Sequence, residues 1–468
     1  MNRDRAERQL RLAAEAGPRR ARALADDPGG PGRPSVFTDC TLRLTNVAAA
    51  LTAVGALEAE RADDILIQFQ ASLAVRRRLQ PQPAGPVLRR GIRGLVPAGS
   101  APPPQPSEPE VPPPAPWRLW PVGRMLPFRD EFAAGELYVL SLLVTEERAQ
   151  ALAIASIRPG GSGGAGYLAG LGPLANITAT DDRGTAYRVN AEGGGIATRW
   201  EGQLTIDPAP PAGARWLELA AGPGVPRLRI DLGVGPPAAD VTVQAQDRPP
   251  GEQLLEHAAQ QILASAVIRP EHIRRQAAGL GDVIAALEAA EALSPLSPVP
   301  GYLATICERL SIDGHGITAA PTAALPGPWL SVLAWYGRRH RPPVHDGTAA
   351  AGTVLPDVGG ARVAVGGLQT RDNRSFLHLV VAPRPSAGPL ADAGPLSQLG
   401  FSCWLRDDTR QWHLAVPESW RGDPAGQVTG TLQVLPPLGR DTARVTLLAS
   451  TLTGRVRAEV PLHWWAAP

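Results

Sequence analysis

The sequence predicts an α+β multidomain protein with two tandem copies of a helical hairpin followed by an antiparallel immunoglobulin-like β-sandwich. Two observations support this fold class. An Ala/Leu-rich helical pattern at 47–57 recurs at 283–293, and a series of short strand-like segments follows each copy of it. Because no helical pattern separates the strand-like segments within a copy, an antiparallel sandwich is favoured over a parallel α/β sheet.

The helical part of each copy shows the spacing of an amphipathic hairpin. Segment 47–57 reads VAAALTAVGAL and segment 283–293 reads VIAALEAAEAL. Each is followed by apolar residues three and four apart, which predicts a second helix. These residues are Leu66, Phe69 and Leu73 in the first copy and Leu303, Ile306 and Leu310 in the second. A further helix is expected over 252–269, ending at Pro270.

The strand-like part of each copy predicts about seven short strands, the number found in immunoglobulin-type sandwiches. Charged or Gly-containing turns separate the segments, as in β-hairpins. The segments are ELYVLSLLVTEE, RAQALAIASI, NITATDD, TAYRVNA, GQLTID, RWLELAA and RLRIDL in the first copy, and FSCWLRDD, RQWHLAV, GTLQVL, ARVTLLA and RVRAEVPL in the second. Arg227-Leu228-Arg229 recurs as Arg455-Val456-Arg457, and Asp181-Asp182 recurs as Asp407-Asp408.

These patterns divide the chain into five parts: an N-terminal helical segment (1–78), a Pro-rich linker (79–116), a first β-sandwich (117–235), a second helical segment (251–313) and a second β-sandwich (326–468). Residues 100–116 contain nine prolines, so the linker is expected to lie extended as polyproline II. The first helical hairpin is therefore expected to lie apart from its sandwich.

Composition excludes several function classes. The formal net charge of +2 is too small to predict nucleic-acid binding from the total. All 46 basic residues are Arg, so phosphate-binding Walker A loops, Schiff-base lysines and Ser-Lys dyads are excluded. Cys40, Cys307 and Cys403 are far apart and are expected to be buried thiols in a reducing compartment. No secretion signal or membrane span is recognised, and a cytoplasmic location is expected.

The stretch RPGGSGGAGYLAG, at 158–170, fits two catalytic motifs at once. G-x-G-x-x-G binds a dinucleotide and G-x-S-x-G presents a serine nucleophile, but both require a helix directly after the glycines. Here the chain runs through YLAGLGPLANITATDD into another strand. The second copy keeps neither motif. We therefore expect a loop between strands and assign no catalytic or cofactor-binding residue and no cofactor.

Four other residues are compatible with a metal or hydrolase site. His340, His345 and Asp346 lie within seven residues, and His315 lies upstream. Strong zinc sites hold their ligands on a helical turn or in paired knuckles, whereas the spacer here is Arg-Pro-Pro-Val. An exposed polar loop is favoured, and no metal ligand is assigned.

The recurrent aspartate pairs have two interpretations. Asp181-Asp182 and Asp407-Asp408 could serve as acid–base carboxylates or calcium ligands. Aspartates also stabilise tight turns through their own backbone, and recurrence in both copies suits a structural turn. Hairpin turns are favoured.

Aromatic and basic side chains supply the candidate interaction surface. Trp117, Trp200, Trp216, Trp329, Trp404 and Trp412 are expected in the core. Adjacent strand residues face opposite sides, so one of Trp464 and Trp465 should be exposed. A basic cluster follows the first hairpin and could contact phosphates or be a solvated face. It consists of Arg76, Arg77, Arg78, Arg89, Arg90 and Arg93.

The stretch from ITATDDRGTAYRV to RWEGQLTIDPAPPAGARWLEL resembles immunoglobulin-like modules attached to bacterial anti-sigma regulators, in which a DD-x-G-x-x-Y hairpin precedes a G-x-L strand. This resemblance implies a binding or sensing role. The favoured hypothesis is a non-catalytic protein-interaction or regulatory protein with an unidentified protein partner. The alternatives are a hydrolase with a His/Asp site between the units and a nucleic-acid accessory protein that uses the Arg cluster.

Overall fold

The computed structural model describes residues 3–25, 36–77, 117–129, 133–159, 176–196, 198–233, 241–244, 248–268, 279–313, 315–322, 324–338, 344–358, 361–382, 401–422, 427–451 and 454–464, with a few single residues between them. Seven helices lie in this part of the chain: α1 (Arg3–Ala25), α2 (Val36–Ala53), α3 (Ala59–Arg77), α4 (Pro250–Ile268), α6 (Leu280–Ala289), α7 (Val299–Arg309) and α8 (Gly327–Tyr336).

The first sheet contains eight strands: β1 (Arg118–Arg129), β2 (Ala133–Val144), β3 (Ala149–Pro159), β4 (Thr178–Asp181), β5 (Ala186–Ile196), β6 (Arg199–Asp207), β7 (Trp216–Ala220) and β8 (Leu228–Asp231). Their order is β1-β2-β3-β6-β5-β4-β7-β8, and every pairing is antiparallel. The sheet curls until β1 contacts β8, and its concave side holds a core of apolar side chains.

The second sheet contains β9 (Val241–Gln244), β10 (Gly347–Val358), β11 (Ala361–Arg371), β12 (Arg374–Ala382), β13 (Phe401–Asp407), β14 (Trp412–Gly422), β15 (Val428–Leu435), β16 (Arg444–Thr451), β17 (Arg455–Pro461) and β18 (His463–Trp464). The order is β18-β10-β11-β12-β15-β14-β13-β16-β17-β9. Strands β10 to β17 thus repeat the order of β1 to β8, and β18 and β9 extend the two ends.

The predicted fold class is wrong. An immunoglobulin-like sandwich has two sheets facing each other, whereas each half here has one continuous hydrogen-bonded sheet that curls on itself. The continuity comes from the long-range pairs β3–β6 and β4–β7. The local alternation of apolar and polar residues predicts a strand but carries no information about which distant strand it pairs with.

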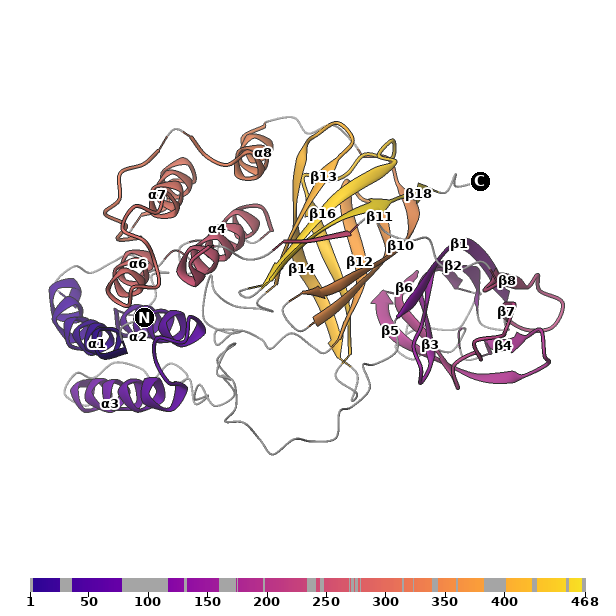
Figure 1. Cartoon of the computed structure of the whole chain (residues 1–468), viewed down its shortest axis with the longest axis horizontal. Helices are drawn as coiled ribbons and strands as arrows, with labels where there is room; N and C mark the ends of the chain where they lie inside the picture. Colours follow the sequence, from indigo (N-terminus) through magenta and orange to yellow (C-terminus); the bar gives the residue numbers. More distant parts are fainter. Residues whose placement is uncertain are drawn as a thin grey trace.

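The helices also depart from the prediction of one helical hairpin ahead of each sandwich. Helices α1 and α2 contact α6, and all seven helices contribute to one shared core. That core extends to Trp404 and Leu414 on the outer face of the second sheet, where Ser331 Oγ of α8 donates to the Trp412 carbonyl at 2.7 Å. The helical layer therefore lies at one end, the second sheet in the middle and the first sheet at the other end (Figure 1).

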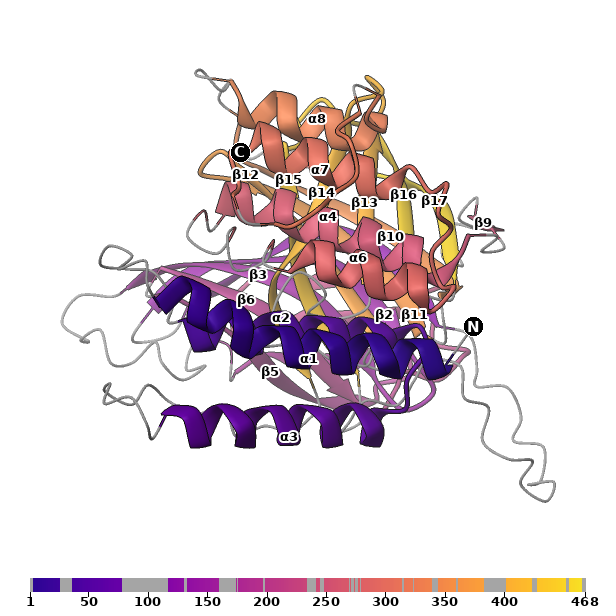
Figure 2. The ribbon, with the colours of Figure 1, turned by 90° about the vertical axis from the view of Figure 1, so that its left-hand side faces the viewer.

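The two helical segments meet although they are far apart in the sequence. Figure 2 shows α1, α2 and α6 side by side in front of the sheets. The predicted patterns 47–57 and 283–293 end in the same kind of turn: the amide of Ala56 donates to the Leu51 carbonyl at 2.8 Å, and the amide of Ala292 donates to that of Leu287 at 2.9 Å. In the described part of the chain, no helix is long and apolar enough to cross a membrane.

The two sheets pack back to back through small and apolar residues. The pairing of β2 with β3 shifts register between Val139 and Ser141. The pairing of β11 with β12 shifts register at the corresponding place, between Val365 and Gly367. The contact core consists of Leu119, Leu140, Leu143, Leu152, Ile154, Ala364 and Val380. Glycines of the second sheet allow this close approach, because a Cβ on Gly367 would lie 3.1 Å from the Cβ of Leu140.

Candidate functional site

The aspartate pairs lie in hairpin turns, as predicted. Asp181 Oδ1 accepts hydrogen bonds from the amides of Arg183 (2.9 Å) and Thr185 (2.8 Å), and Oδ2 accepts one from the Tyr187 hydroxyl (2.7 Å). Desolvation alone would raise the pKa of Asp181, but these hydrogen bonds outweigh it and hold the pKa below its ordinary value. The Asp181 carboxylate therefore stabilises the hairpin turn by accepting these hydrogen bonds.

The second aspartate pair has matching contacts. Asp407 Oδ1 accepts from the amide of Gln411 at 2.7 Å, and Asp408 Oδ2 accepts from the amide of Ala443 at 2.9 Å. At the position corresponding to Tyr187 stands His413, whose Nε2 lies 3.4 Å from Asp407 Oδ2 and whose Nδ1 donates to the Pro436 carbonyl at 2.8 Å. Both pairs therefore stabilise a turn by accepting backbone amides, and they differ in the side chain at the Tyr187 and His413 position.

The described members of the histidine group contact different elements. The carbonyl of His315 accepts from the amide of Gly281 at the start of α6 (2.9 Å), whereas that of His345 accepts from Thr370 Oγ1 of β11 (2.7 Å). Asp346 accepts from the amide of Asp372, and His340 lies outside the described residues. Within the described part of the chain, no three His, Cys, Asp or Glu side chains are placed to hold a metal ion.

Several sequence candidates lie partly or wholly outside the described residues. The glycine-rich stretch is described only as far as Pro159, at the end of β3. Of the Arg cluster, Arg76 and Arg77 end α3, with side chains that are not described, and Arg78, Arg89, Arg90 and Arg93 lie beyond. Trp464 is half-buried and its indole N–H donates to the Thr442 carbonyl, while Trp465 is not described.

All three cysteines are buried and none is in a disulfide, as expected. Burial raises the pKa of both Cys307 and Cys403 to about 12. At neutral pH these sulfurs are therefore thiols and not thiolates, and the thiolate is the nucleophilic form.

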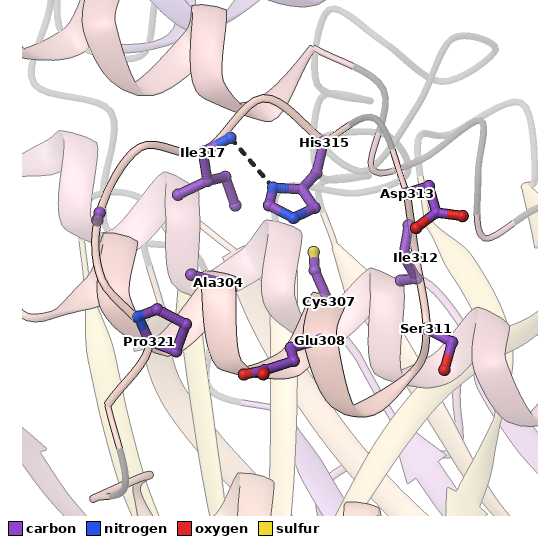
Figure 3. Close-up of a pocket in the computed structure, with 10 residues that line it drawn as sticks. Ala304, Cys307, Glu308, Ser311, Ile312, Asp313, His315, Ile317 and Pro321 are labelled. Carbon is purple, nitrogen blue, oxygen red and sulfur yellow. Dashed lines mark hydrogen bonds between the residues drawn. The ribbon is translucent and has the colours of Figure 1, made fainter.

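The sequence did not predict a depression of about 450 Å³ between α7 and the loop that follows it (Figure 3). Ala304, Cys307 and Glu308 line it from α7, and Ser311, Ile312, Asp313, His315, Ile317, Ala319 and Pro321 line it from the loop. Thr305 fixes the loop, because its Oγ1 donates to the Thr322 carbonyl at 2.9 Å and accepts from the Thr322 amide at 2.8 Å.

The side chains of His315 and Cys307 point toward one another across this depression (Figure 3). The amide of Ile317 donates to His315 Nδ1 at 3.1 Å, so in the neutral ring the proton is on Nε2. A protonated thiol beside an imidazole N–H lacks the base needed to activate the sulfur. The arrangement suits hydrogen bonding to a bound group better than nucleophilic chemistry.

A second polar group lies between the sheets. Glu201 Oε1 of β6 is 2.7 Å from Arg199 Nη2 and 3.0 Å from Arg371 Nη2 of β11, and Arg199 also donates to Gln369. His378 lies close enough that these charges act on it. Burial, together with the two arginines, lowers the pKa of His378 to about 4 although Glu201 opposes this, and its Nε2 has no partner. These residues link the first sheet to the second.

The fold defines a protein of two curled antiparallel sheets, stacked back to back, with one helical layer on the second sheet. No family model matches the sequence, and no curated protein is significantly similar to it. Among solved structures, the chain matches the crystal structure of the conserved domain protein from Bacillus anthracis, with 4% identity, a TM-score of 0.15, and coverage of 69% of this chain and 75% of that one.

Proposed function

We propose that this chain is a non-catalytic protein-interaction or regulatory protein, with a binding role of the kind that the resemblance to anti-sigma-regulator modules implies. The observation that carries the proposal is that apolar side chains fill the concave side of both curled sheets. Curled sheets that carry small-molecule chemistry commonly keep a cavity inside. A filled interior leaves the outer surfaces and strand edges for recognition.

The protonation states of the buried groups support the same proposal. The thiol of Cys307 lines the depression with a pKa of about 12, and the imidazole of His257, buried in α4, has a pKa lowered to about 4 by desolvation. A nucleophile or base tuned for neutral pH would have a pKa near 7. Three buried cysteines outside disulfides also suit a reducing compartment such as the cytoplasm.

We further infer that the two sheets are copies of one unit. Their eight-strand orders are the same, and the aspartate turns and the register shifts at β2 and β11 correspond. Two similar units in one chain suit bivalent binding, in which engagement of one unit raises the effective concentration of the other. The resemblance to the anti-sigma-regulator modules supports a binding role only, because the immunoglobulin-like sandwich of those modules is not the fold of this chain.

The test is affinity capture from the native cell lysate with the full chain, followed by mass spectrometry and by cross-linking of the captured pair. A single protein at near-stoichiometric amount, retained after nuclease treatment, would support the proposal. A triple substitution of Arg76, Arg77 and Arg78 to Glu is the matched test of the nucleic-acid alternative, since phosphate contacts would be lost. An enzymatic activity abolished by one side-chain substitution would refute the proposal.

A further inference from the structure

The outer edge of β8 corresponds to a strand edge that is occupied in the second sheet. Among the described residues, β8 ends the first sheet and no strand pairs with its outer side. In the second sheet β17 has the corresponding place, and β9 pairs with it antiparallel. The two edges share a sequence pattern, Arg227-Leu228-Arg229 and Arg455-Val456-Arg457. The second sheet therefore shows what such an edge binds, namely a short extended strand.

The backbone of β8 presents the groups that strand addition requires. The Arg229 carbonyl accepts a hydrogen bond from Arg124 Nη1 of β1 at 3.1 Å, so this carbonyl points away from β7. In an antiparallel sheet the amide and carbonyl of one residue pair on the same side. The corresponding residue in the second sheet, Arg457, lies opposite Thr242 of β9. The Arg124 side chain thus occupies a position where the second sheet has a paired strand. Strand β1 also contacts β8, as β10 contacts β17 in the second sheet, where β9 is nevertheless paired.

The charge of this edge selects the kind of strand that binds there. The guanidinium of Arg229 is exposed and lies 4.1 Å from the centre of the Trp216 ring, and Arg124 is exposed on β1 across from it. Arg227 is paired with Glu218 at 2.8 Å. Asp231, the exposed carboxylate at the end of β8, accepts from the Gly233 amide at 2.9 Å. Arg229 and Arg124 are then the exposed charges of this edge that no described carboxylate pairs, which favours a negatively charged partner.

The segment that binds the corresponding edge of the second sheet has matching chemistry. Its described residues are Val241–Gln244. In the sequence this strand lies within Ala-Ala-Asp-Val-Thr-Val-Gln-Ala-Gln-Asp (238–247), which has an aspartate on either side of the β-branched residues. Its paired strand carries Arg455 and Arg457. The chain itself thus provides a short extended strand for this type of edge, from a segment whose sequence carries two aspartates and no basic residue.

We propose that the outer edge of β8 binds an extended acidic segment of a partner protein as an added antiparallel strand. This inference rests on the proposed interaction function and names the surface and the class of partner. Main-chain hydrogen bonds supply the affinity, and the charges of Arg229 and Arg124 supply the selectivity. Displacement of the Arg124 side chain from the Arg229 carbonyl accompanies binding.

The experiment measures binding of a fluorescein-labelled peptide, AADVTVQAQD, to the full-length protein by fluorescence anisotropy. The key variant is Arg229→Pro, which removes an amide that faces away from β7, a position where edge strands tolerate proline. Arg229→Ala removes the charge but keeps the amide. Arg457→Ala changes the corresponding residue of the second sheet, where β9 is already paired, and is the matched control. Circular dichroism and the melting temperature verify that each variant is folded.

We expect saturable binding that weakens at least tenfold in Arg229→Pro, weakens less in Arg229→Ala, and is unchanged in Arg457→Ala. Raising the ionic strength should weaken wild-type binding, since exposed charges are screened. Absence of saturable binding up to millimolar protein, equal binding of a scrambled peptide, or equal binding by folded Arg229→Pro would overturn the proposal. A concentration-dependent dimer that Arg229→Pro abolishes would identify a second copy as the occupant and would overturn the assignment to a partner.

Failure of this inference is distinguishable from failure of the proposed function. If the full chain captures a stoichiometric partner and Arg229→Pro leaves the capture unchanged, the interaction function stands and this edge is not its site. If the peptide binds as expected but the chain shows a catalytic activity that one substitution abolishes, the peptide-binding edge of β8 is supported and the non-catalytic function is refuted.

Discussion

Substitution of Gly352 by Ala should destabilise the interface between the two sheets. A Cβ at this position would lie 2.4 Å from Cδ and 2.9 Å from the backbone nitrogen of Pro121 in the first sheet. Carbon atoms pack optimally at about 3.5–4.0 Å, so the shorter of these contacts is at least about 1 Å too close. Neither the proline ring nor its backbone can rotate away as a flexible side chain would. The strands must therefore separate or shift.

Overpacking of this kind typically costs about 1–3 kcal/mol, and we expect the free energy of unfolding of Gly352→Ala to fall by that amount. Urea unfolding followed by circular dichroism and by tryptophan fluorescence measures it. Gly439→Ala is the matched control, because nothing lies within 4 Å of its added Cβ, and it should change stability by no more than about 0.5 kcal/mol.

A double-mutant cycle tests the physical cause. Adding Pro121→Ala to Gly352→Ala removes the ring that the new Cβ meets, so part of the lost stability should return. The coupling between two contacting residues is typically about 0.5–3 kcal/mol. If Gly352→Ala is as stable as Gly439→Ala, or if the two effects simply add, the account of the inter-sheet contact is wrong.

Three further predictions follow from buried groups. His257 and His378 have a pKa of about 4 in the folded protein and about 6.5 when unfolded, so protons bind preferentially to the unfolded chain between these values. Stability should therefore fall as the pH drops from about 6.5 to about 4, by roughly 1–3 kcal/mol for each histidine, and a melting temperature constant over this range would contradict the buried neutral state. The Cys307 thiol, with a pKa of about 12, should react with Ellman's reagent at pH 8 only after unfolding; rapid reaction of the native protein would show that it is accessible. Tyr187→Phe deletes the hydroxyl that donates to a buried turn carboxylate at 2.7 Å, and urea unfolding should show a loss of about 1–3 kcal/mol, whereas no loss would assign the turn's stability to its backbone hydrogen bonds.

The sequence predicts local structure better than the arrangement in space. The strand-like segments ELYVLSLLVTEE and RAQALAIASI lie largely within β2 and β3, and the helix expected over 252–269 is α4. Strand β10, in contrast, begins with Gly-Thr-Ala-Ala-Ala-Gly, whose small residues have low strand propensity. Those residues permit the close packing of the two sheets, a role that depends on a partner surface distant in the sequence.

The candidate sites show the same limit. Burial of the three cysteines could be predicted, because their wide spacing suits neither a disulfide framework nor a zinc site and an unpaired cysteine is usually buried. The ion-paired group of Arg199, Glu201 and Arg371 could not, because arginine and glutamate on a strand usually indicate a solvated face. The depression beside α7 could not be predicted from the sequence, because residues of a helix and of an irregular loop line it together and no sequence motif marks that combination.

The position of the N-terminal helices has a consequence for synthesis on the ribosome. Helices α1 and α2 pack against α6, which begins at Leu280, more than 200 residues beyond the end of α3 at Arg77. At a translation rate of roughly 5–20 residues per second, the nascent chain waits on the order of 10–40 s before α6 emerges. During that interval the Ala- and Leu-rich side of α2 that later meets α6 has no docking site. Helices α1 and α2 thus complete their packing only after the chain has been made as far as α6.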